Sequence, residues 1–307
     1  MIGAGVPFEE VPVIKVAREE HAGEERPGLL KPTIRVFMEN RLAVVGVGIV
    51  AFFVLFCFVG PLVYHTNQVQ ANPVISDRAP SLQHLLGTDD AGYDVVGRLM
   101  AGGQTTLIVA LAVAVLATSF GTIWGAVAGF AGGMIDGAMM RIVDSILSIP
   151  TLFLLLFVAT IATPSVLLLI VVISGVSWLV PSRLVRSETL ALRTSQYVDA
   201  SRAAGSRPAG IVFRHIIPNV FGTVVVNATF QVADAVLAIA YLSFLGLGIP
   251  PPAANWGSML SQGVNYVFAG YWWEIWPAGL CIVALVVAFN FIGDGLRDAV
   301  EVRLQQR

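Results

Sequence analysis

Charged side chains are scarce in this chain of 307 residues. Only 12% of the residues are Asp, Glu, Lys or Arg, whereas 56% are hydrophobic, and the mean hydropathy is +0.78. A typical globular domain is about one-quarter charged, so this composition argues against a large soluble α/β domain. The formal net charge of −2 also predicts no nucleic-acid partner.

Lysine and cysteine are scarcer still. The only lysines, Lys15 and Lys31, lie near the N-terminus. A phosphate-binding loop ending in Gly-Lys-Ser/Thr therefore cannot be formed, and the chain cannot hydrolyse ATP by itself. Cys57 and Cys281 lie inside apolar runs, and the four histidines lack the spacing of metal ligands. We expect no catalytic residue, no metal site and no cofactor bound by this chain.

The chain contains several long runs of apolar residues. A bilayer core about 30 Å thick needs roughly 20 helical residues, and residues 143–182 are long enough for two spans with a turn near Pro164. The other four candidate spans are residues 42–64, 105–130, 221–245 and 275–293. We predict an all-α integral membrane protein with six transmembrane helices. Its expected parts are a polar cytoplasmic tail (1–40), the first span with an outer-side loop (41–104) and a core domain (105–307).

Basic residues are distributed unevenly between the expected connections. With six spans, 16 of the 18 Lys and Arg residues fall on the side of both termini, and only Arg78 and Arg98 fall on the other side. Since short cytoplasmic connections are enriched in Lys and Arg, we expect both termini in the cytoplasm. Residues 183–220 then form the largest internal cytoplasmic loop.

That loop contains the signals of a short helix. Thr194 or Ser195 can cap its start, Asp199 suits the first turns, and Gly205 can adopt the left-handed conformation that ends a helix. We predict about ten helical residues, then a turn and a second segment leading to Pro218. Such a short helix is not stable alone and needs a partner surface. A solvated basic linker that only sets the orientation is the alternative.

The sequence "DASRAAGSRPAGIVFRHIIP", residues 199–218, resembles the conserved cytoplasmic loop of binding-protein-dependent ATP-binding-cassette importer permeases. Ser201 stands where the pattern has its second Ala, and His215 stands where it has Ile. Three further segments resemble the dipeptide/oligopeptide/nickel branch of these permeases: 86–107, 242–260 and 289–303. Asp replaces the first Glu of the pattern, and the matching positions are Asp199, Ala200, Gly205 and Pro218.

The resemblance implies a type I importer permease architecture. In that family the loop is a coupling helix that docks in a groove of the ATPase subunit. The implied partners are a second homologous permease subunit, two ATP-binding-cassette ATPase subunits or domains that use ATP and Mg, an extracytoplasmic solute-binding protein, and membrane lipid. The implied location is the bacterial plasma (inner) membrane. The residues expected to couple the ATPase to this chain are Tyr197, Asp199, Ala200, Arg202, Ala203, Gly205 and Pro218.

Polar residues recur in the expected fifth span. Asn227, Gln231 and Asp234 are spaced i, i+4 and i+7, which places them on one helix face. Because polar groups are costly in hydrocarbon, this face is expected to line a translocation path. Hydrogen bonding between helices of the bundle is the alternative.

Small and aromatic residues mark two other surfaces. The pattern of Gly121, Gly125 and Gly129 allows close helix packing, within this chain or against another permease. On the outer side, Asn255 can cap a short helix, and the tryptophans at 272, 273 and 276 resemble an interfacial belt.

These observations favour the permease subunit of an ATP-driven importer of di- or oligopeptides, in which closure of the ATPase drives alternating access. The alternatives are a stand-alone secondary transporter or channel, a permease of the same kind for nickel or another small solute, and a non-transporting scaffold. Against the first of these alternatives, the sequence shows no obvious inverted repeat.

Overall fold

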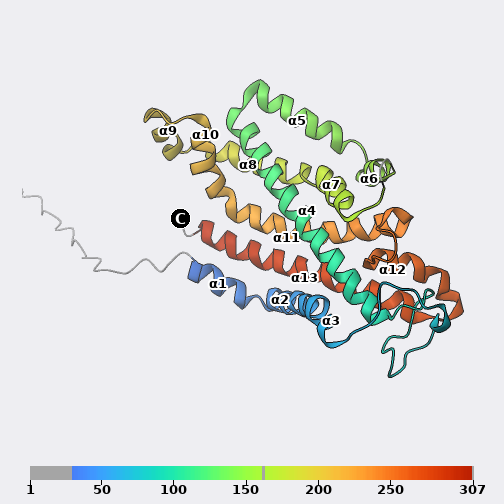
Figure 1. Ribbon diagram of the computed structural model, residues 1–307. Helices are drawn as coiled ribbons and strands as arrows, with labels where there is room; N and C mark the ends of the chain where they lie inside the picture. Colours follow the sequence, from blue (N-terminus) through green and yellow to red (C-terminus); the bar gives the residue numbers. More distant parts are fainter. Residues whose placement is uncertain (1–29, 161–162, 306–307) are drawn as a thin grey trace, which may run out of the picture.

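The computed structural model describes residues 30–160 and 163–305, and within these residues the chain is helical and has no strand (Figure 1). This confirms the predicted all-α class. The α-helices are α1 (Leu30–Glu39), α2 (Arg41–Val54), α3 (Gly60–Val63), α4 (Val95–Ala131), α5 (Gly133–Leu147), α6 (Thr151–Ala159), α7 (Val166–Ser177), α8 (Leu179–Leu192), α9 (Gln196–Ala203), α10 (Pro208–Ile211), α11 (Ile217–Leu242), α12 (Trp256–Gly263) and α13 (Trp272–Gln305). Shorter helical turns are η1 (Leu55–Val59), η2 (Pro73–Ile75), η3 (Val212–Ile216), η4 (Ser243–Leu247) and η5 (Val264–Ala269).

Five helical runs in the described residues are long and apolar enough to cross a membrane, and a bent pair makes a sixth candidate. The runs are Arg41–Val63, Val95–Ala131, Val166–Leu192, Pro208–Leu247 and Trp272–Glu301. Three of them contain the predicted spans 105–130, 221–245 and 275–293, and Arg41–Val63 covers all but the last residue of the predicted span 42–64. Val166–Leu192 contains the second span expected within residues 143–182.

The remaining candidate differs from the prediction. It starts earlier, at Gly133, and consists of α5 and the beginning of α6, which meet at an angle of 82°. Pro150 stands directly before α6. A proline cannot donate a backbone hydrogen bond and disfavours helix in the residue before it, so α5 ends at Leu147. The helical pattern is interrupted near Pro164, as expected, because α6 ends at Ala159 and α7 begins at Val166. Ser165 caps α7 by accepting a hydrogen bond from the Leu168 amide at 3.1 Å.

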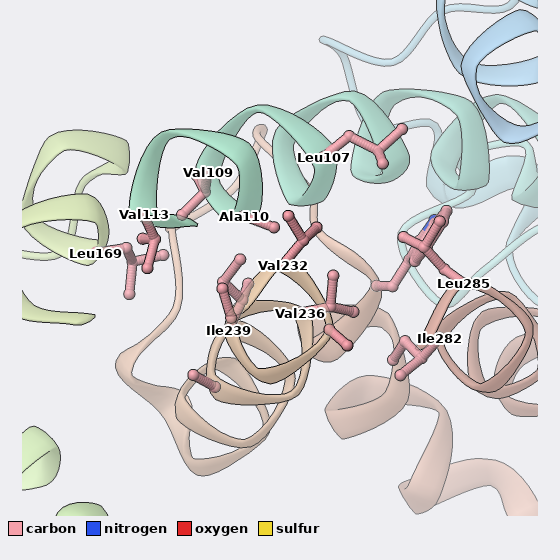
Figure 2. Close-up of a cluster of buried hydrophobic side chains, with 14 of the residues drawn as sticks. Leu107, Val109, Ala110, Val113, Leu169, Val232, Val236, Ile239, Ile282 and Leu285 are labelled. Carbon is pink, nitrogen blue, oxygen red and sulfur yellow. The ribbon is translucent and has the colours of Figure 1, made fainter. Parts of the chain in front are cut away.

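The main core lies where α4, α7, α11 and α13 meet (Figure 2). Its buried side chains recur at helical spacing, so each helix presents one apolar stripe to the others. Lipid is as apolar as these side chains, and the association therefore depends on close van der Waals packing. The labelled core residues are Leu107, Val109, Ala110, Val113, Leu169, Val232, Val236, Ile239, Ile282 and Leu285.

The small residues of α4 pack within this chain, against α8. A methyl group added at Gly121 would lie 2.7 Å from the Trp178 carbonyl oxygen, and one at Gly129 would lie 2.8 Å from the Arg186 carbonyl oxygen. Gly125 approaches the Ser182 backbone in the same way. Of the two interpretations of this pattern, the structure therefore supports close packing inside one chain, and α4 and α8 form a tight pair.

The N-terminal part of the chain is not uniformly a tail. Residues 1–29 of the predicted tail lie outside the described residues, but α1 is helical from Leu30. Asn40 then caps α2 by accepting hydrogen bonds from the Leu42 and Ala43 amides, and its Nδ2 donates to Asp298 Oδ2 at 3.1 Å. The cap therefore also ties the start of α2 to α13.

The end of the bundle farthest from α9 is closed by α12 and the loop before α4. Asn255 forms a capping box with Ser258 at the start of α12, as the sequence predicts. The Trp256 indole is fully buried, and its Nε1 donates to the Leu99 carbonyl oxygen at 2.9 Å. Trp273 is also buried and donates to the Thr88 carbonyl oxygen. Its assignment to a surface belt is therefore wrong, because its indole supports the loop.

Arg98, in the first turn of α4, joins this loop to the segment before α12. Its guanidinium lies 4.1 Å from the centroid of the Tyr93 ring, donates to the Pro252 carbonyl oxygen at 2.6 Å, and lies 3.5 Å from the Asp89 carboxylate. Burial raises the pKa of Asp89, an effect opposed by the backbone amide of Tyr93 and by Arg98. The contacts of the buried Arg98 side chain therefore hold together the end of the bundle that carries α12.

Candidate functional site: an exposed short helix and a polar helix face

The short helix expected after Ser195 is present as α9. Ser195 occupies the N-cap position, Asp199 lies in the first turn, and Gly205 has a φ of +80° just beyond the end. One detail of the prediction is wrong: the Ser195 side chain makes no capping hydrogen bond to α9, and its hydroxyl donates to the Leu192 carbonyl oxygen at 2.6 Å. The Thr194 hydroxyl likewise donates to the Ala191 carbonyl oxygen, at 3.1 Å, in the turn before α9.

The segment that connects α8 to α11 is more compact than the expected loop of residues 183–220. Helix α8 continues through Arg183 and Arg186 to Leu192. Two salt bridges, which the sequence analysis missed, tie this extension to α5. Arg186 binds both carboxylate oxygens of Asp136 at 2.6 Å, and Arg183 pairs with Asp144. Helix α9 therefore follows a part of α8 that is fixed to α5 by two salt bridges.

Most of α9 is presented to the surroundings. Val198 is fully buried and anchors the helix, whereas the expected coupling residues of α9 are exposed. Gly205 is exposed as well, and a methyl group added there would meet nothing within 4 Å. The exposed coupling residues of α9 are Tyr197, Asp199, Ala200, Arg202 and Ala203. An exposed surface of small residues beside a charged pair suits a protein partner, and docking there stays a prediction.

Two contacts connect α9 to the bundle. Ser201 Oγ lies 3.2 Å from His215 Nε2, which links α9 to the turn η3 before α11. The Arg202 guanidinium lies 5.2 Å from the centroid of the Phe130 ring at the end of α4, and it also pairs with Asp199 at 3.1 Å. Helix α9 therefore contacts both the end of α4 and the segment before α11. Pro218, the last of the expected coupling residues, stands in the first turn of α11, directly after the helical turn η3.

The three polar residues of α11 line two separate hollows. Asn227 lines a cavity of about 500 Å³ between α8, α11 and α13. Gln231 and Asp234 line a second cavity of about 310 Å³ between α6, α7, α8 and α11. Gln231 is also buried, and its Nε2 donates to the Ser177 carbonyl oxygen at 3.2 Å. Gln231 therefore takes part in hydrogen bonding between helices, which was the alternative interpretation. That Asn227, Gln231 and Asp234 line a translocation path stays a prediction.

Comparison with known families gives matches over most of the chain. Residues 121–306 match the family described as the inner membrane component of binding-protein-dependent transport systems. Residues 28–80 match the N-terminal transmembrane domain of oligopeptide transport permease C. The first match covers the two cavities, α9 and the extension of α8.

Several curated proteins are similar over nearly their whole length. The oligopeptide transport system permease protein OppC of Bacillus subtilis is 33% identical over 287 residues, which are 94% of each chain. The protein of the same name in Escherichia coli is 38% identical over 269 residues, 87% of this chain and 89% of that protein. The Haemophilus influenzae protein is 35% identical over 286 residues, 92% of each chain.

Proposed function

Because this chain belongs to the family of binding-protein-dependent transport system inner membrane components, we propose that it is the permease subunit of an ATP-driven importer of oligopeptides. The chain is a multi-pass membrane protein and supplies the passage, while other subunits supply solute and energy. The observation that carries the proposal is the exposed helix α9, joined to both α4 and α11.

The partners follow from this assignment. We propose that a second homologous permease completes the passage and that two ATP-binding-cassette subunits bind ATP and Mg and grip α9. A solute-binding protein delivers the peptide at the end that carries α12. The distribution of basic residues supports a cytoplasmic position for both termini and for α9.

The contacts of α9 suggest how closure of the ATPase reaches the passage. A force on α9 acts through Ser201 and His215 on the start of α11 and through Arg202 and Phe130 on the end of α4. Helix α8 is packed on α4 along the small residues and braced by α5. The unit then moves as a body and opens one side of the passage while it closes the other, which is alternating access.

Reconstitution tests the proposal. The chain is assembled in liposomes with a candidate partner permease, ATPase subunits and solute-binding protein, and uptake of radiolabelled tri-alanine is followed with and without ATP. We expect uptake that needs ATP and every subunit. Uptake that persists without the ATPase subunits would identify a stand-alone carrier, and uptake of nickel but not of tri-alanine would contradict the peptide assignment.

A further inference from the structure

The larger cavity is built from stripes on three helices. The lining residues of each helix are spaced three or four apart, so each helix offers one face to the hollow. Helix α11 packs between α8 and α13 and forms the central wall (Figure 1). The lining residues are Leu184 and Glu188 of α8, Thr223, Val226, Asn227 and Phe230 of α11, and Arg297, Val300 and Glu301 of α13.

The charges in this lining are of both signs. Glu188 of α8 and Glu301 of α13 are acidic, and Arg297 of α13 is basic. Within the part of the chain that the structure describes, none of the three forms a salt bridge. The Asn227 Oδ1 atom is buried and has no hydrogen-bond partner among the described residues. Arg297 and Glu301 are exposed and Glu188 is half-buried, so these charged groups can be reached from solvent. Together with the buried Asn227 oxygen, which lacks a partner, they suit a polar ligand with complementary charges.

The rest of the lining is apolar. Val226, Phe230 and Val300 give the hollow a surface on which aliphatic or aromatic groups can pack. The volume of about 500 Å³ falls within the roughly 300 to 1,000 Å³ of pockets that enclose small organic ligands. A ligand that matches the whole lining carries one cationic end, one anionic end, amide groups between them and variable side chains.

We propose that this cavity binds a short peptide by its two charged ends, at the last stage of transport before release. Glu188 accepts hydrogen bonds from the α-ammonium group, Arg297 donates to the α-carboxylate, and Asn227 contacts the peptide backbone. The proposal rests on the proposed function, since it assumes that peptides pass through the chain. It goes further by assigning a binding site and naming the groups that are recognised.

Recognition of the ends suits a transporter of varied peptides. Every unmodified peptide has an ammonium group, a carboxylate and backbone amides, whereas the side chains differ. Hydrogen bonds to charged groups are stronger than those between neutral groups, and Arg can bind a carboxylate through two parallel bonds. The proposed site therefore binds the ammonium group, the carboxylate and the backbone amides that all peptides have. The apolar wall accommodates side chains that differ.

The position of the cavity makes it an exit site. Its α11 residues follow closely on the segment that His215 joins to α9, and its α13 residues lie near the end of that helix. The loop before α4 and α12 lie at the opposite end of the bundle (Figure 1). A shift of α9 moves the start of α11 and so changes the distance between the Glu188 and Arg297 walls. Peptide release and the state of the ATPase are coupled at this point.

Blocked peptides test the site without the solute-binding protein. Binding of tri-alanine, N-acetyl-tri-alanine and tri-alanine amide is measured on the detergent-solubilised complex of permeases and ATPases, with wild-type chain, Glu188→Gln and Arg297→Gln. We expect Glu188→Gln to weaken binding of the two peptides with a free ammonium group about tenfold and to leave the acetylated peptide unchanged. Arg297→Gln is expected to weaken binding of the two peptides with a free carboxylate by a similar factor and to leave the amide unchanged. The controls Glu39→Gln and Arg35→Gln remove an exposed pair on α1 and should change none of the affinities.

The outcomes separate this inference from the proposed function. If tri-alanine is taken up by the reconstituted wild type but each variant binds all three peptides as the wild type does, the cavity is not the site, while the importer assignment stands. Absence of tri-alanine uptake in the complete system contradicts the proposed function instead. Gel filtration of each complex shows that the variants assemble, and Asn227→Leu gives a second check. This variant should weaken the binding of all three peptides by the same factor. Unchanged affinity would overturn the contact assigned to Asn227 and the peptide backbone.

Discussion

Ser201 Oγ and His215 Nε2 lie 3.2 Å apart, and this contact joins α9 to the segment that leads into α11. Both residues depart from the usual pattern of the permease loop, which has Ala and Ile at these two positions. The two departures meet in space and form a polar pair. In this chain, a polar contact therefore joins α9 to the segment before α11.

The pair can be tested by replacing each residue with its counterpart in the pattern. Ser201→Ala or His215→Ile alone leaves one polar group without its partner, which costs about 1 kcal/mol. We expect each single variant to lower peptide uptake per ATP hydrolysed, and the double variant to recover most of the loss. Ser187→Ala, whose exposed hydroxyl bonds only within α8, is the control. Losses that simply add in the double variant would show that the two residues act independently.

Gly205 is expected to be essential for coupling. Its φ of +80° is rarely adopted by other residues, so Gly205→Val should strain the turn by about 1–3 kcal/mol and displace α9. Insertion into the membrane should be unchanged, while ATP hydrolysis becomes uncoupled from uptake. The matched control is Gly210→Val, because an added side chain there also has open space but the backbone φ is ordinary. Equal uptake by both variants would refute the role of the turn.

A cysteine at Ala203 should crosslink to an ATPase subunit in the assembled complex. Ala203 is exposed on α9, whereas Val198 on the same helix is fully buried. With a short bifunctional thiol reagent and single cysteines placed along the groove of the ATPase, we expect a product from Ala203→Cys and none from Val198→Cys. A crosslink from neither position in a complex that transports peptide would contradict docking at α9.

Close packing of α4 on α8 should make Gly125 intolerant of a side chain. An added methyl group would overlap the Ser182 backbone, and overpacking of this kind costs about 1–3 kcal/mol. Gly125→Ala should therefore lower the thermal unfolding midpoint of the detergent-solubilised protein. Gly137→Ala, where the methyl group meets nothing within 4 Å, should not. Similar midpoints for the two variants would mean that α4 and α8 separate easily.

The Asp136–Arg186 pair should support α8 near α9. Arg186→Gln removes a bidentate contact to a charged group and is expected to cost about 2 kcal/mol in stability. Asp136→Asn should cost a comparable amount, and the double variant less than the sum, because neither charge is then left alone. Denaturant titration of the four proteins measures the interaction. Strict additivity would count against a direct pair.

Local signals in the sequence predicted much of this structure. Long apolar runs predicted the spans, and Asn255 predicted the start of α12. Asp199 and Gly205 together predicted α9. These features depend on residues that are close together in the chain. The spacing of Gly121, Gly125 and Gly129 predicted close packing of helices, because small residues permit close approach. It left open whether the partner lies in this chain or in another permease, and the contact with α8 decides for this chain.

Features that depend on distant residues were not predicted. The Asp136–Arg186 pair joins residues 50 apart, and the charged cavity combines Glu188 with Arg297 across three helices. The bend between α5 and α6 was missed because the apolar pattern continues through Pro150, and composition alone does not distinguish a straight span from a bent one. The polar face of α11 was correctly placed on one helix, but only the packing of its neighbours divides it between two hollows.

Helix α4 has a consequence for the speed and fidelity of transport. Its 37 unbroken residues extend about 55 Å. Phe130 lies under Arg202 at one tip, and Leu99 holds the Trp256 indole near the other. In the proposed importer, this one helix joins the docking segment to the end where the solute-binding protein would bind. We therefore expect a movement of α9 to reach Trp256 without an intermediate hinge, which would keep delivery and release of the peptide in phase.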